Sequence, residues 1–408
     1  MKTYPAIPVS NKKYPAHEGH ATALKALAIS IVSLVSSIAM AQQGVSNDSG
    51  SKGIKDDQLS KVMVVDAIAE NGEFEARWVK PAERNAAIKY LVAFSNLTPV
   101  MSQKMIDINN WETLGFDLDT VNKDATFKAA AEATSGMMPE LFVDASLLKK
   151  CTFELEYEQG FSLLLPQLGK MRGAARCLRV QARWEAANGK TDLATSYLAT
   201  MIRMGRHTSN DGFIISSLVG VAVSQLAMAE IRLMAQGGVL TLEDRDELNR
   251  LFESLDAKDP MNLVMALNVE SKVTHQWIKN RFKGPQAGVD LAAEFFPLTN
   301  STDAEDEIRK QLLERMDEGM IAKDLARMQE AYQATLTAWD APDAKDQLVA
   351  VERRVLDNQY GLLSTLFLPA LGKAHTSNVR FIEDITKTID ILKSAKLRDH
   401  DAQAVQTP

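Results

Sequence analysis

Four arginines recur at helical spacing in the middle of the chain, and their side chains are the best placed to do chemistry. Their intervals of four, three and four positions put four guanidinium groups on one face of a helix: Arg172, Arg176, Arg179 and Arg183. Planar guanidinium groups bind phosphate and carboxylate oxygens in bidentate fashion. The stripe is therefore a candidate anion-binding site. The alternative is a solvated face whose charges pair with Glu154, Glu156, Glu158 or Glu185.

The two cysteines, Cys151 and Cys177, would close a loop of 27 residues if they were bridged. In the chain-entropy account, such a disulfide stabilises the folded state by about 3 to 4 kcal/mol. We expect this disulfide, and the alternative is two separate thiols that pack as small apolar side chains. A catalytic thiol is not indicated, because neither cysteine has a motif around it or a histidine near it in sequence.

Other chemistry-bearing patterns are incomplete. Gly189-Lys190-Thr191 is similar to the end of a phosphate-binding loop, but Trp184 stands where the first glycine of that motif belongs. A calcium loop would also need a turn glycine and a closing glutamate, which are missing around Asp117, Asp119 and Asp124. The sequence predicts no metal site, no cofactor and no catalytic residue.

Glu270 lies within an otherwise apolar helical segment and is the one acidic residue that the pattern marks as buried. A buried glutamate with a shifted pKa can mark a functional site. The alternative, which we favour, is a glutamate that caps a helix or pairs with a cation.

The elements that must position these residues are helices. Pro166 suits the first turn of a helix, and Asn188-Gly189 ends it. The segment from Gly189 to Ala194 is typical of the turn of a tetratricopeptide-type helical hairpin, without evidence for a repeat array. The most apolar helix, expected at 211–235, is interpreted as a buried central helix, because a membrane span would be longer and less polar.

Helical spacing dominates the rest of the chain and predicts an all-α fold, an irregular helical bundle or stacked helical hairpins with at most one or two short strands. Alternating polarity predicts one strand at 151–157, and residues 61–68 fit either a strand or a helix start. A long loop is expected at 283–304. The further helices are expected at 81–94, 98–108, 123–135, 192–207, 241–255, 305–339, 343–367 and 377–396.

The N-terminus has the pattern of an export signal. Lys25 precedes an apolar run of 13 residues, Ala26 to Ile38, and Ala39-Met40-Ala41 fits a cleavage site. The run is too short to cross a bilayer, which needs roughly 20 residues of helix. We therefore expect a signal peptide at 1–41, a flexible linker at 42–60, a mostly helical unit at 61–150, a main helical domain at 151–396 and a disordered tail at 397–408.

Cleavage after Ala41 would leave 42 basic and 52 acidic side chains, a net charge of −10. Such a charge argues against nucleic-acid binding, which needs a positive field. The compartment outside the inner membrane also permits the disulfide.

The stretch from Cys151 to Glu230 resembles a family of uncharacterised exported helical proteins of planctomycete bacteria. The resemblance rests on Cys-x-Phe at 151–153, Tyr157, Gly160, Leu-Leu-Pro166, Arg172, Ala-Ala-Asn-Gly189, Ala194 and Ile215-Ser-Ser-Leu. It implies an exported location and a helical fold, and it supplies no catalytic residues.

These observations predict an exported protein, periplasmic or extracellular, that does not span the membrane after signal cleavage. Its expected function is that of a helical interaction or scaffold protein. The expected partner is a protein or a small ligand. The alternative is a carrier that holds an apolar or anionic small ligand between helices. A hydrolase with an unrecognised site is the third possibility.

Overall fold

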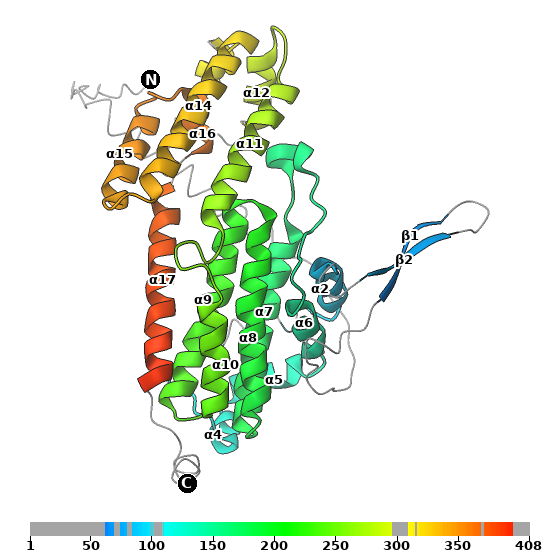
Figure 1. Ribbon diagram of the computed structural model, residues 1–408. Helices are drawn as coiled ribbons and strands as arrows, with labels where there is room; N and C mark the ends of the chain where they lie inside the picture. Colours follow the sequence, from blue (N-terminus) through cyan, green and yellow to red (C-terminus); the bar gives the residue numbers. More distant parts are fainter. Residues whose placement is uncertain are drawn as a thin grey trace, which may run out of the picture. The chain divides into compact units, whose positions relative to one another are not determined.

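The computed structural model contains 14 α-helices and one two-stranded sheet in the part of the chain that it describes, so the all-α prediction is confirmed (Figure 1). The described residues are 62–68, 74–79, 84–98, 101, 108, 110–295, 309–314, 316–368 and 371–394. The expected signal peptide, linker and C-terminal tail lie outside these residues. The described residues form two compact units, one within Lys279–Leu371 and the other within Val62–Ile278 together with Gly372–Ser394.

The larger unit is built around three long helices that follow one another in sequence. They are α7 (Pro166–Ala187), α8 (Thr191–Thr208) and α9 (Ile214–Gln236), and each packs against the other two. The remaining helices that the structure describes in this unit are α2 (Ala86–Phe94), α4 (Leu118–Lys123), α5 (Ala125–Thr134), α6 (Pro139–Ser146), η3 (Tyr157–Ser162), η4 (Ser209–Asp211), α10 (Leu242–Glu253), α11 (Leu263–Arg281) and α17 (Leu371–Ser394). The last two continue across the unit boundary.

The α7–α8 turn confirms the predicted helical hairpin. Gly189 has a φ of 78°, a left-handed conformation that glycine adopts without steric cost. Its backbone N–H donates to the carbonyl of Ala186 at 3.0 Å and so satisfies one of the last carbonyls of α7. The short turn brings α8 back antiparallel along α7, which is what the Asn188-Gly189 break indicated.

Helix α9 is the buried central helix that its composition predicted. It is the one helix among the described residues that is long and apolar enough to cross a membrane, and 61% of its most apolar window is buried inside the protein. Its neighbours α7 and α8 cover it on two sides. A core helix of a helical protein has the same length and composition.

Residues 61–68, which fitted either a strand or a helix start, contribute a strand. β1 (Val62–Ile68) pairs antiparallel with β2 (Phe74–Val79), from Val62 opposite Val79 to Ile68 opposite Phe74. The register shifts by one residue between Val65 and Ala67.

The strand predicted at 151–157 is wrong. The alternation is real, because Cys151 and Phe153 are buried while Thr152 and Glu154 are exposed, but within the described ranges no strand lies beside the segment. The side-chain amide of Asn85 takes that place: it donates to the Thr152 carbonyl at 2.7 Å and accepts from the Thr152 N–H at 2.9 Å. Alternating burial therefore arises here without a sheet.

The smaller unit contains α12 (Ala287–Phe295), α14 (Glu318–Trp339), α15 (Ala344–Leu356) and α16 (Leu362–Phe367). The loop expected at 283–304 is wrong over α12, because Pro285 and Pro297 flank this helix and do not interrupt it. Ala287, Leu291 and Ala292 recur at helical spacing and are buried.

Two of the long helices expected in the C-terminal part are interrupted, and a third begins earlier. Asp317 lies outside the helical conformation and caps α14 by accepting from the Met320 N–H, so 305–339 is not one helix. Gly361, at a φ of 85°, separates α15 from α16. The last helix begins at Leu371, before the expected 377.

The division into units also differs from the boundary expected near residue 150. Helix α5 packs on α7, and α6 packs on α8, so the helices before 150 share one core with those after it. The separate unit lies instead at 279–371.

Candidate functional site

The arginine stripe of α7 divides into an inner and an outer half. Arg179 and Arg183 turn inward to the buried Glu230 of α9. The Arg179 Nε lies 2.9 Å from one carboxylate oxygen, and the Arg183 Nε donates to the other. Arg183 and Glu230 are both fully buried, so this is an internal ion-pair triad.

The chain before α4 completes the triad. Arg183 donates to the backbone carbonyls of Leu114 and Trp111, the latter at 3.1 Å. The guanidinium of Arg179 lies 3.9 Å from the centroid of a Trp111 ring, and that of Arg183 lies 4.0 Å from the Phe116 ring. Arg183 is fully buried and Arg179 nearly so, and both guanidinium groups face internal partners, so neither is placed to bind an external ligand.

Arg172 and Arg176 form the outer half, and both are partly buried. Neither has a hydrogen bond or ion pair with any residue that the structure describes. Burial lowers the pKa of Arg176, and the positive charge of Arg172 lowers it further. No ion pair joins either arginine to the expected glutamates, and Glu185 pairs instead with Lys190 at 3.0 Å. Two unneutralised guanidinium groups thus lie one turn apart on the same helix, and an oxyanion between them would relieve their repulsion.

Cys151 and Cys177 are free thiols in the structure, and both are buried. The expected disulfide is not formed there, and the alternative of two separate core residues describes what is seen. Burial raises the pKa of the Cys177 thiol to about 12. It also raises the pKa of Cys151, to which the negative charge of Asp211 adds. Neither thiol has the lowered pKa that a nucleophilic cysteine needs.

A second polar cluster lies where α8 joins α9. Asp211 in η4 accepts a hydrogen bond from the Gln167 amide at 3.0 Å, and Tyr157 donates to the Asp211 backbone carbonyl at 2.7 Å. Glu270 of α11 accepts from the Ile214 N–H at 2.9 Å, at the first residue of α9. Glu270 therefore caps the start of α9, which is one of the two roles that the favoured interpretation of the sequence left open.

His207 lies near the end of α8 and is held by uncharged groups. The Tyr90 hydroxyl lies 2.9 Å from its Nδ1, and the ring is also hydrogen-bonded to the backbone of Leu148. Burial lowers the pKa of His207 to about 4, and the positive charges of Arg203 and Arg206 act in the same direction. The imidazole is therefore neutral at physiological pH and part of the core.

Two of the three aspartates that were compared with a calcium loop are helix caps. Asp117 accepts from the Thr120 N–H at 2.8 Å, and Asp124 accepts from the Phe127 N–H at 2.7 Å. Asp119 is exposed and lies 3.6 Å from Lys123. Within the described ranges, no group of three or more histidine, cysteine or acidic side chains is arranged to hold a metal ion.

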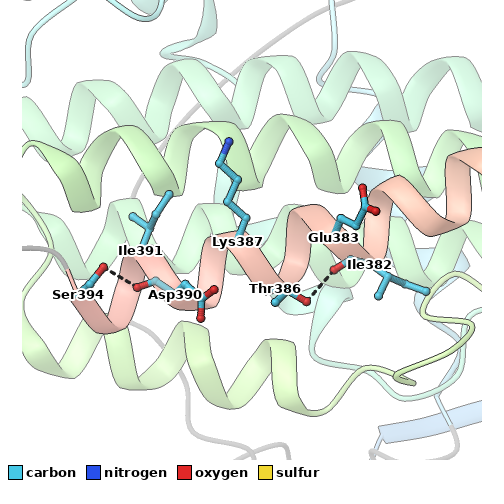
Figure 2. Close-up of a pocket in the computed structure, with 7 residues that line it drawn as sticks. All are labelled: Ile382, Glu383, Thr386, Lys387, Asp390, Ile391 and Ser394. Atoms are coloured by element: carbon cyan, nitrogen blue, oxygen red, sulfur yellow. Dashed lines mark hydrogen bonds between the residues drawn. The ribbon is translucent and has the colours of Figure 1, made fainter.

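A depression of about 450 Å³ lies along α17, and Figure 2 shows its lining. It is open to solvent, and its described lining comes from this single helix: Ile382, Glu383, Thr386, Lys387, Asp390, Ile391 and Ser394. Such a surface does not enclose a small molecule, which usually has most of its surface buried when bound.

Sequence reasoning missed the two acidic residues at the centre of these clusters, Glu230 and Asp211. A signal for Glu230 was present, because it is the one ionisable residue in the apolar stretch 213–231, where a charge must have a partner. No comparable signal marked Asp211, which lies in a turn.

The fold and the site define an all-α protein with a three-helix core and an internal ion-pair triad. The protein also contains the arginine pair Arg172 and Arg176, which forms no ion pair with a described residue. Comparison with protein-family models, with curated proteins and with solved structures finds no match for the chain. The planctomycete resemblance over 151–230 therefore stays an expectation.

Proposed function

We propose that this chain is an exported helical interaction protein that binds an acidic group of a partner at Arg172 and Arg176. The observation that carries the proposal is the lack of any ion pair for these two partly buried cations among the described residues. The full chain has a net charge of −7, so acidic side chains outnumber basic ones. Two arginines without an acidic partner are therefore unexpected in this protein.

The paired geometry favours an oxyanion ligand. Two guanidinium groups one helical turn apart can each donate two parallel N–H bonds to a carboxylate or phosphate. Because they are partly desolvated, their attraction to an anion is less screened than that of exposed lysines. Glutamate and aspartate side chains of a partner protein supply such groups, and a small oxyanion would be recognised by the same chemistry.

The export half of the proposal rests on residues 1–41, which lie outside the described structure. Expression of the full-length chain in a bacterial host and intact-mass measurement of the envelope fraction test it. The mass should correspond to a chain that begins at Gln42. An uncut chain in the cytoplasmic fraction would contradict export.

The binding half is tested by titration calorimetry at low salt with a poly-glutamate peptide and, separately, with inorganic phosphate. The Arg172→Ala/Arg176→Ala variant should bind the peptide roughly tenfold more weakly or worse, since a charge-assisted hydrogen bond contributes about 1.5 to 3 kcal/mol. The matched control is Lys149→Ala/Lys150→Ala, which removes two exposed cations before α7.

The outcomes separate the ligand sources. Peptide binding that is lost only in the arginine variant supports a protein partner, while binding of phosphate alone supports a carrier of small anions. Equal binding by the wild type and both variants would rule out the arginine pair as the site.

A further inference from the structure

The junction between α8 and α9 is held by side chains from several elements. The chain from Ser209 to Ile214 forms η4 and then turns at Gly212, which has a φ of 76°. Tyr157 of η3 stacks on Phe213 at 5.4 Å between ring centroids. The Asn262 amide before α11 donates to the Asn210 side chain at 2.8 Å.

Two buried carboxyl groups, those of Asp211 and Glu270, also belong to this junction, and neither pairs with a cation among the described residues. Asp211 is 3% exposed and accepts hydrogen bonds from the neutral Gln167 amide of α7 and the Ser216 hydroxyl of α9. The titratable groups that its charge influences are Cys151 and Tyr157, which are weak acids and therefore uncharged at neutral pH.

Glu270, which contacts the start of α9, is likewise buried without a described cation beside it. Its described hydrogen-bond partner is the backbone N–H of Ile214, and no lysine, arginine or histidine among the described residues pairs with it. An ionised carboxylate that loses water without gaining a cation costs several kcal/mol, and the group avoids this cost by taking up a proton.

We propose that Asp211 and Glu270 form an acid-strengthened clamp, in which protonation of the two buried carboxyls stabilises the α8–α9 junction as the surroundings become more acidic. The clamp includes neither Arg172 nor Arg176, and the inference is independent of the proposed binding function. It suits a chain exposed to an environment whose pH varies.

The direction of the effect follows from where the two groups titrate. Burial raises the pKa of Asp211 from 3.8 to about 6 and that of Glu270 from 4.5 to about 7. The folded state therefore holds protons that the unfolded state has released. The stabilisation is fully present below the unfolded values and is lost as the pH rises through about 6 and 7.

His207 acts in the opposite direction in the same range, because its pKa is lowered. The contribution of the clamp must therefore be measured as the difference in stability between the wild type and a variant at each pH, and not from the wild-type curve alone. The variant Asp211→Asn/Glu270→Gln replaces both carboxyls by neutral amides of the same shape and leaves His207 in place.

Urea unfolding of the full chain at intervals between pH 4 and pH 8 tests the clamp. At pH 8 the amide variant should have the higher midpoint relative to the wild type, and this advantage should disappear as the pH falls to 4. The new amide N–H groups find no acceptor in the site and can lower the midpoint of the variant by a constant amount at every pH. Such a constant amount does not alter how the difference between the midpoints changes with pH. The matched control is Asp246→Asn/Glu253→Gln, two exposed residues of α10, whose offset should vary little with pH.

If the double variant does not fold, Glu270→Gln alone is measured, and its advantage should change mainly between pH 4.5 and pH 7. Variant and wild-type midpoints that run parallel from pH 4 to pH 8 would overturn the proposal. The same holds if the exposed control changes with pH as much as the buried variant does.

Discussion

Gly205 of α8 and Gly220 of α9 face each other where the two helices cross. A Cβ on Gly205 would lie 2.6 Å from the Gly220 carbonyl oxygen, and a Cβ on Gly220 would come closer still to the Gly205 carbonyl. Atoms cannot approach so closely, so the two backbones touch only because neither residue has a side chain. This contact sets how closely the two central helices pack.

Gly220→Ala should destabilise the fold by about 1 to 3 kcal/mol, because the helices must separate to admit the methyl group. Thermal or urea unfolding measures the change. The control is Gly319→Ala, at an exposed position in the first turn of α14, where the nearest atom to a new Cβ is the Asp317 side-chain oxygen at 3.3 Å. This oxygen also caps α14, and a shift of a few tenths of an ångström makes room for the methyl group. The control should be neutral or slightly stabilising, and an equal loss in both variants would contradict the close-contact interpretation.

Glu230→Gln should cost about 3 to 5 kcal/mol, because it leaves Arg179 and Arg183 buried without their counter-charge. The comparison is Asp119→Asn, which breaks the exposed pair with Lys123 and should cost about 1 kcal/mol or less. Urea unfolding of both variants gives the two values. A small loss for Glu230→Gln would mean that water reaches the triad.

His207 should destabilise the protein as it is protonated. Its pKa lies at about 4 when folded and near 6.5 when unfolded, so its contribution is present above pH 6.5 and is lost as the pH falls toward 4. The wild type should therefore lose up to about 3 kcal/mol relative to His207→Gln over this range. Unfolding curves that remain parallel would show that the buried imidazole is not the cause.

The two cysteines should be free and unreactive in the folded protein. A thiol reagent added at neutral pH should modify neither Cys151 nor Cys177, because both are buried and the pKa of each thiol is raised. After denaturation without reductant, two thiols per chain should react. Intact-mass analysis provides the check, since a disulfide would lower the mass by two hydrogens and prevent modification.

The sequence by itself determined the fold class and the local structure of the central helices. Pro166, the Asn188-Gly189 break and the apolar spacing between 211 and 235 specify helix starts, ends and buried faces through short-range sterics and periodicity. These rules act within a few residues, so one sequence is enough to apply them. The same rules placed the helical hairpin at Gly189.

Only the tertiary structure decided which charges are available. The arginine spacing placed four guanidinium groups on one face of α7, but it could not show that Glu230, 47 residues away from Arg183, turns two of them inward. Likewise, the alternation at 151–157 could not reveal that Asn85 replaces a neighbouring strand. Burial and ion pairing depend on residues far apart in the chain, and their free energies are decided by which elements pack together.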